Sequence, residues 1–279
     1  MIFELFQFKF FFNAAFAALL TSISCGIIGT YIVSKRIVFI SGGITHASFG
    51  GIGLGYYLGF NPIIGAICFS ILSALGIEFM AKKTDVREDS AIAIMWSFGM
   101  AIGIIFIFLT PGYAPNLLNY LFGNILTVSL TDIFFSLLLA TGITIFFVLF
   151  IKPIVYISFD EEFSRTRKIR VDLLNYTLIS FVALTIVLSI KVAGIILVIS
   201  LLTIPQASAN LFIKDFRKII IYSVLIGFIG SMGGLITSYY LDIPSGAAII
   251  FLLVLIFIFL RLLKFLLTRA RQQNQNQIP

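Results

Sequence analysis

The chain has a single histidine, His46, and the residues around it leave the imidazole accessible. Read as a helix, the sequence places Gly42 and Gly50 one turn to either side of His46, so the ring stands on a stripe without large side chains. Thr45 and Ser48 add hydroxyl groups close by. Histidine is the commonest metal ligand among side chains. His46 is therefore a candidate metal ligand; the alternative is a neutral histidine bonded to a carbonyl of a neighbouring helix.

One imidazole alone does not make a storage site for a metal ion. Zinc normally takes four ligands, and the sequence around His46 does not supply them. A symmetric dimer would bring a second His46 to the same place. This favours a ligand that an ion meets in transit over a site that retains the ion.

Small residues recur at every fourth position beside His46. In a helix they form a ridge on one side, and such a ridge lets two membrane helices bring their backbones close together. We expect the ridge to pack against a symmetry mate or a neighbouring helix; its members are Gly43, Ala47, Gly51, Gly55 and Gly59.

The composition indicates that this helix lies in a membrane. Of the 279 residues, 60% are hydrophobic and 11% are charged, and the mean hydropathy is +1.11. The chain has too few polar groups to cover its surface in water, and its apolar runs are continuous rather than alternating. The predicted class is an all-α, multi-pass membrane protein. The net charge of +7 is carried by loops beside the membrane and does not indicate nucleic-acid binding.

Basic clusters divide the apolar runs and determine the predicted topology. If the clusters at 35–36, 82–89, 152–172, 214–218 and 261–271 are cytoplasmic, 17 of the 19 lysines and arginines lie on that side. The spacing then predicts about nine transmembrane helices, with the N-terminus outside and the C-terminus in the cytoplasm. Eight is the fallback, because Lys191 and Pro205 could shorten or break a helix within 173–213.

Two parts of the chain follow from this division. Residues 1–264 are expected to form one transmembrane domain. Residues 265–279 are polar and are expected to form a disordered cytoplasmic tail.

The segment 203–218 is a candidate docking surface on the cytoplasmic side. Pro205 permits a bend, and Ala207 and Ala209 allow close approach. Apolar side chains are expected on one face and charged ones on the other: Leu211, Phe212 and Phe216 against Lys214, Asp215, Arg217 and Lys218. Such a helix could dock into a partner's groove, and the alternative is an ordinary basic loop at the membrane. The charged segment 158–172 is likewise either a docking surface or a solvated loop.

The sequence lacks the motifs of several enzyme classes. It contains no G-x-x-x-x-G-K-[ST] nucleotide loop, no H-E-x-x-H and no G-x-S-x-G. The chain is therefore predicted not to be an enzyme. If it moves a substrate uphill, a separate subunit must supply the energy.

Six motifs in a fixed order connect these features to a known family: H-A-S-F-G-G-I-G-L-G, R-E-D-S-A-I-A-I-M-W-S-F-G, L-L-N-Y-L-F-G-N, F-D-E-E-F-S, L-L-T-I-P-Q-A-S-A and L-D-I-P-S-G-A-A-I. Over about residues 14–264 the chain resembles the membrane permease subunit of bacterial zinc/manganese/iron ABC importers. The resemblance implies a type II-like importer fold in the bacterial inner membrane. It also implies a homodimer that forms the pathway for a divalent metal ion, and no cofactor bound by this chain.

The resemblance further implies partners and a coupling segment. Two cytoplasmic ATP-binding subunits would drive transport, and an extracytoplasmic metal-binding protein would deliver the ion. The segment that meets the ATP-binding subunit would be Pro205, Gln206, Ala207, Ser208, Ala209, Asn210, Leu211 and Phe212.

The sequence departs from the family at one position that bears on the ion. The family usually has an aspartate one turn before the histidine, and here that position is Gly42. Manganese prefers oxygen ligands while zinc accepts nitrogen, so the change favours zinc or iron. The alternatives are a permease for a metal chelate or corrinoid, a self-sufficient channel or secondary carrier, and a membrane enzyme.

Overall fold

A computed structural model describes residues 7–111 and 125–275 of the chain. The motif L-L-N-Y-L-F-G-N, residues 117–124, lies outside them. The elements in chain order are α2 (Lys9–Lys35), α3 (Val38–Leu58), α4 (Pro62–Lys83), α5 (Glu88–Leu109), η1 (Ile125–Thr127), α7 (Leu130–Phe159), α8 (Glu161–Thr166), α9 (Val171–Ala193), α10 (Ile195–Leu201), α11 (Ile204–Asn210), α12 (Phe216–Leu241) and α13 (Ser245–Gln275). The described part is all helical, which confirms the predicted class.

Seven of the described helices are long and apolar enough to cross a membrane: α2, α4, α5, α7, α9, α12 and α13. Helix α3 is not among these seven, although its 21 residues, at about 1.5 Å each, match a bilayer core of about 30 Å. Where the second crossing in 173–213 is predicted, the structure has two short helices, α10 and α11, instead of one continuous helix. Nine crossings and the orientation of the termini therefore stay predictions.

The interruptions in this region have local causes. Gly194 ends α9 with a φ of 79°, a conformation that favours glycine. Thr203 has non-helical backbone angles and directly precedes α11, whose second residue is Pro205. Proline lacks the N–H that a continuous helix would need at that point. The predicted break at Pro205 is thus present, in the form of two helices of seven residues each.

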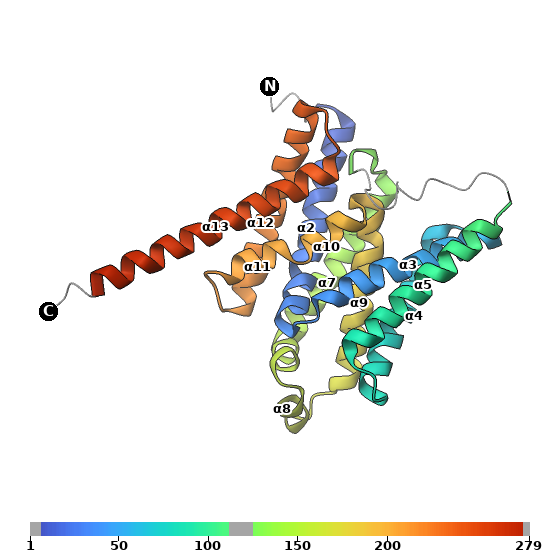
Figure 1. Cartoon of the computed structure of the whole chain (residues 1–279), viewed down its shortest axis with the longest axis horizontal. Coiled ribbons are helices and arrows are strands. Elements are labelled where there is room, and N and C mark those ends of the chain that lie inside the picture. The colour runs from blue at the N-terminus through green and yellow to red at the C-terminus, as the bar shows by residue number, and fades with distance from the viewer. Residues whose placement is uncertain (1–6, 112–124, 276–279) are drawn as a thin grey trace.

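Helix α2 runs through the middle of the molecule (Figure 1). It is the most buried of the seven candidate spans, and it contacts α7, α9 and α12. Helices α3, α4 and α5 pack together on one side, and α12 and α13 form a helical hairpin on the other, with α11 beside them. Small and large side chains of α2 are both fully buried: Ala14 and Ala17 as well as Phe11 and Tyr31.

The expectation of a disordered tail after residue 264 needs a correction. Helix α13 continues to Gln275, so the first part of the segment 265–279 is helical rather than disordered. The long helix extends away from the rest of the molecule (Figure 1). Polarity alone therefore did not end this helix, because Arg, Gln and Leu all have high helix propensity.

Candidate functional site

Helix α3 is held against α4 and α5 through the predicted ridge of small residues. A Cβ atom built on Gly99 of α5 would lie 2.5 Å from the Cα of Ala47. On the α4 side, the backbones of Gly51 and Gly65 are so close that neither position has room for a side chain. The ridge thus packs against neighbouring helices of the same chain.

The remaining ridge residues play two different parts. A Cβ on Gly43 would overlap Ile92 of α5, and one on Gly55 would lie 2.6 Å from the Cα of Pro62. Gly59 is different, because it ends α3 with a φ of 72° and a Cβ there would meet nothing within 4 Å. Its role as a packing residue was wrongly predicted: the fourfold spacing continues one residue past the helix, where glycine serves as a left-handed cap.

His46 lies on α3 against Trp96 of α5, the only tryptophan in the chain. The two rings are stacked, with centroids 4.3 Å apart and planes 3° from parallel. His46 is half-buried. Among the described residues its Nδ1 is buried without a hydrogen-bond partner. The ring is therefore held by stacking on Trp96 rather than by a hydrogen bond to Nδ1.

The polar groups expected near His46 are turned back onto their own helix. Thr45 Oγ1 donates to the carbonyl of Ser41 at 2.5 Å, and Ser48 Oγ donates to the carbonyl of Thr45 at 2.6 Å. Gly42, one turn before His46, faces Trp96: a Cβ atom built on it would lie 3.9 Å from the indole Cζ3. Within the described residues, no cluster of three or more His, Cys, Asp and Glu side chains is present. One copy of the chain thus offers a single nitrogen donor at this place.

The predicted coupling segment is mostly buried in its own chain. Pro205, Gln206, Ser208 and Ala209 are buried, and Gln206 Nε2 donates to the carbonyls of Cys25 at 2.8 Å and Leu201 at 3.0 Å. The bond to Cys25 joins α11 to the central helix α2, and the bond to Leu201 joins it to α10. The exposed part follows α11 and contains Phe212, Lys214, Asp215, Arg217 and Lys218.

The predicted apolar face of this segment is wrong in one respect. Phe212 has 47% of its surface exposed, whereas Phe216 begins α12 and is buried. The two rings therefore do not share a docking face. The start of a new helix at Phe216, with Asp215 as its N-cap, changes the direction of the side chains between them.

Comparison with known proteins gives the family. A family model described as the ABC 3 transport family matches residues 7–264. The chain belongs to this family. It is a permease subunit of the metal-type ABC transporters, as the six motifs predicted, and a multi-pass protein of the bacterial membrane.

Relatives cover nearly the whole permease. A protein of Chlamydia pneumoniae named as a probable metal transport system membrane protein is 43% identical over 84% of this chain and 82% of its own length. The manganese transport system membrane protein MntC of Listeria monocytogenes is 32% identical over 91% of this chain and 90% of its own. The structure of PsaBC from Streptococcus pneumoniae in complex with Fab matches with a TM-score of 0.82 and 30% identity, over 93% of this chain and 95% of that one.

The permease also has an ionic network that the sequence did not predict. Lys35 at the end of α2 and Lys82 at the end of α4 both reach Glu161 of α8, at 2.8 and 3.3 Å. Lys82 also lies 2.7 Å from Glu78. Asn175 of α9 accepts from Lys35 and donates to Glu161. Four helices are thus joined at one end of the permease.

The segment 158–172 was predicted to be either a docking surface or a solvated loop. The network shows that it also joins helices of its own chain. Burial raises the pKa of Glu161, but the hydrogen bond from Lys35 and the charges of Lys35 and Lys82 outweigh this and leave the pKa below its usual value. Farther along, Arg165 and Asp172 form an exposed ion pair at 2.7 Å. The charges were visible in the sequence, but their partners lie on helices that only packing brings together.

Proposed function

We propose that this permease forms the pathway of an ATP-driven importer for divalent transition-metal ions, and that His46 is a ligand the ion meets on its way. The observation that carries the proposal is the state of His46: one nitrogen buried without a partner, and a ring held flat against Trp96. Such a ring offers Nε2 as a lone-pair donor once Nδ1 carries the proton. A metal-binding histidine normally donates its other N–H to an acceptor, and that acceptor is missing here. Binding at His46 would therefore be weak, as transit requires.

The proposed assembly is a homodimer with two cytoplasmic ATP-binding subunits and an extracytoplasmic metal-binding protein. Two copies would supply two imidazoles to one pathway. The exposed turn after α11, which contains Phe212 and Lys214, is the surface we assign to the ATP-binding subunit. The anchoring of α11 to α2 through Gln206 supports this assignment, because a push on the turn would be passed to the central helix.

Zinc or iron(II) is the proposed cargo, because Gly42 stands at the position, one turn before His46, where the resemblance implies an aspartate. Manganese is the second candidate, and the observation in its favour is the name of the relative from Listeria monocytogenes. A metal chelate would be a third class of cargo.

Uptake measurements test the proposal. The full permease is reconstituted in vesicles with its ATP-binding and metal-binding partner proteins, and uptake of radioactive zinc, iron and manganese is measured with and without ATP. We expect ATP-dependent uptake of a free ion, and a sharp loss in His46→Gln with dimer formation unchanged. Wild-type uptake in His46→Gln would make the histidine structural. Uptake without ATP would favour a carrier, and uptake of only a chelated ion would favour the chelate permease.

A further inference from the structure

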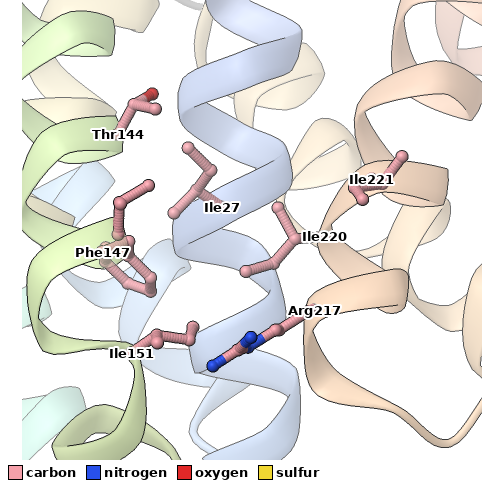
Figure 2. A pocket seen from close by; sticks show the side chains of 8 residues that line it. Ile27, Thr144, Phe147, Ile151, Arg217, Ile220 and Ile221 are labelled. Atoms are coloured by element: carbon pink, nitrogen blue, oxygen red, sulfur yellow. The ribbon is translucent and has the colours of Figure 1, made fainter.

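An apolar groove with one positive charge lies between α2, α7 and α12, away from His46 (Figure 2). Its volume is about 310 Å³. The walls are aliphatic and aromatic, with one threonine and one arginine: Ile27, Thr144, Phe147, Val148, Ile151, Arg217, Ile220 and Ile221. The groove opens outward, since Val148 and Ile221 have 70% and 58% of their surface exposed.

Arg217 is the single charged group of the lining. Among the described residues it has neither an ion pair nor a hydrogen bond, and Figure 2 shows its side chain lying between α12 and the apolar residues of α2 and α7. The nearest acid in sequence, Asp215, is occupied as a helix cap, accepting from the backbone N–H of Lys218 at 2.9 Å. The guanidinium is thus available for an anion.

The level of Arg217 along the helices places it near a membrane surface. Arg217 is the second residue of α12. It lines the groove together with Ile27, about two turns before the end of α2, and Ile151, about two turns before the end of α7. The ends of those helices carry Lys35 and Asp160, in the part of the chain that the positive-inside rule assigns to the cytoplasm. From Arg217 the groove continues along α12 to Ile221.

We propose that this groove binds an anionic phospholipid of the cytoplasmic leaflet. The phosphate of the lipid would lie on the Arg217 guanidinium, and an acyl chain would lie against Ile27, Phe147 and Ile221. A soluble anion would leave the apolar walls exposed, and an apolar peptide would leave the arginine buried without a partner. Basic pockets between membrane helices on the cytoplasmic side bind anionic headgroups in this way. A guanidinium also suits a phosphate through its paired N–H groups.

The bound lipid would affect the permease through α12. Arg217 is the second residue of α12, which follows the exposed turn assigned to the ATP-binding subunit, so a lipid that joins α12 to α2 and α7 would fix the start of α12. This effect is independent of the metal carried and of His46.

Spin-label spectroscopy tests the lipid site directly. The purified full-length permease is placed in phosphatidylcholine vesicles with a trace of spin-labelled phosphatidylglycerol or spin-labelled phosphatidylcholine, and the motionally restricted fraction is measured. We expect the wild type to favour phosphatidylglycerol. Arg217→Gln should weaken the preference roughly fivefold, the effect of one basic residue at a membrane surface. Lys218→Gln is the matched control, since it removes the same charge one residue later but does not line the groove.

A second pair of variants tests the apolar part. Ile221→Trp should fill the groove and lower the restricted fraction, whereas Leu225→Trp, one turn farther and outside the lining, should not. Gel filtration of each variant checks that it is folded. An equal loss of the phosphatidylglycerol preference in Arg217→Gln and Lys218→Gln would show that general surface charge causes it, and would overturn the proposal. Displacement of the lipid by millimolar inorganic phosphate, or cross-linking of Ile221→Cys between copies, would also overturn it.

Discussion

The indole of Trp96 lies parallel to the imidazole of His46, with ring centroids 4.3 Å apart. These are the only tryptophan and the only histidine of the chain, and they come from different helices. The contact has two consequences. It holds the candidate ligand without a hydrogen bond to Nδ1, and it places the one indole fluorophore of the chain against that candidate ligand.

Trp96 should act as a positioning residue for His46. Because an aromatic pair contributes about 0.5 to 1.5 kcal/mol, Trp96→Leu should raise the KM for metal uptake roughly two- to tenfold. Trp96→Phe keeps a stacking ring and should restore most of the affinity. Uptake kinetics check this, and an equal change in both variants would show that stacking is not the cause.

Metal binding should change the fluorescence of Trp96. In purified permease we expect zinc, iron(II) or manganese to alter the tryptophan emission, because Nε2 belongs to the imidazole ring that stacks on the indole. His46→Gln should abolish the change while the protein remains folded. A response of the same size in His46→Gln would locate the metal elsewhere.

Restoring the family's carboxylate should shift ion preference toward manganese. Gly42→Asp has room, since a Cβ there would be 3.9 Å from the nearest atom of Trp96. A hard oxygen donor one turn from His46 favours manganese over zinc. The measurement is the ratio of manganese to zinc uptake in competition, and Gly42→Asn, which has the same shape without the charge, should not shift it.

The contact of α3 with α5 should not tolerate a single added methyl group. Gly99→Ala would place a Cβ 2.5 Å from the Cα of Ala47, which forces the backbones apart. We expect a loss of about 1 to 3 kcal/mol of stability. Gly142→Ala in α7 is the control, because its Cβ would meet nothing within 4 Å. Thermal unfolding in detergent compares the two, and equal stability would contradict the packing described.

Acid should weaken the ionic network around Glu161. Its pKa is lower in the folded protein than the ordinary value, so its contribution to stability is complete above about pH 4.5 and is lost as the pH falls through the folded pKa. Glu161→Gln should cost about 1 to 2 kcal/mol at pH 7 and should flatten the decline of stability in acid. Unfolding measured from pH 7 to pH 3 gives the outcome. An unchanged acid profile in the variant would mean that other carboxylates cause the decline.

The turn after α11 should bind the ATP-binding subunit. Phe212→Asp puts a charge on its most exposed apolar residue and should abolish co-purification of that subunit while membrane insertion is normal. The control is Phe259→Ala, which removes an exposed aromatic ring from α13, distant in sequence from the turn. Stoichiometric co-purification with Phe212→Asp would exclude this turn as the dock.

The sequence alone determined the class of protein, the family and many helix ends. These are local properties: long apolar runs require helices in a membrane, Asn61 and Pro62 start α4, and Pro205 interrupts the chain beside α11. The repeat of small residues likewise marked α3 as a closely packed helix. Each of these follows from the residues within a few turns of one another.

Only the tertiary structure decided which residues meet. The stack of His46 on Trp96, the burial of Phe216 and the network of Lys35, Lys82 and Glu161 all depend on how helices are rotated against each other. In a soluble protein the polar face of a helix reveals its rotation. The helices of this permease are apolar on nearly every side, because lipid and protein interior are equally apolar, so the sequence pattern does not say which face turns inward. Close contacts of small residues, such as Ala47 with Gly99, set that rotation, and they exist only once the helices have packed.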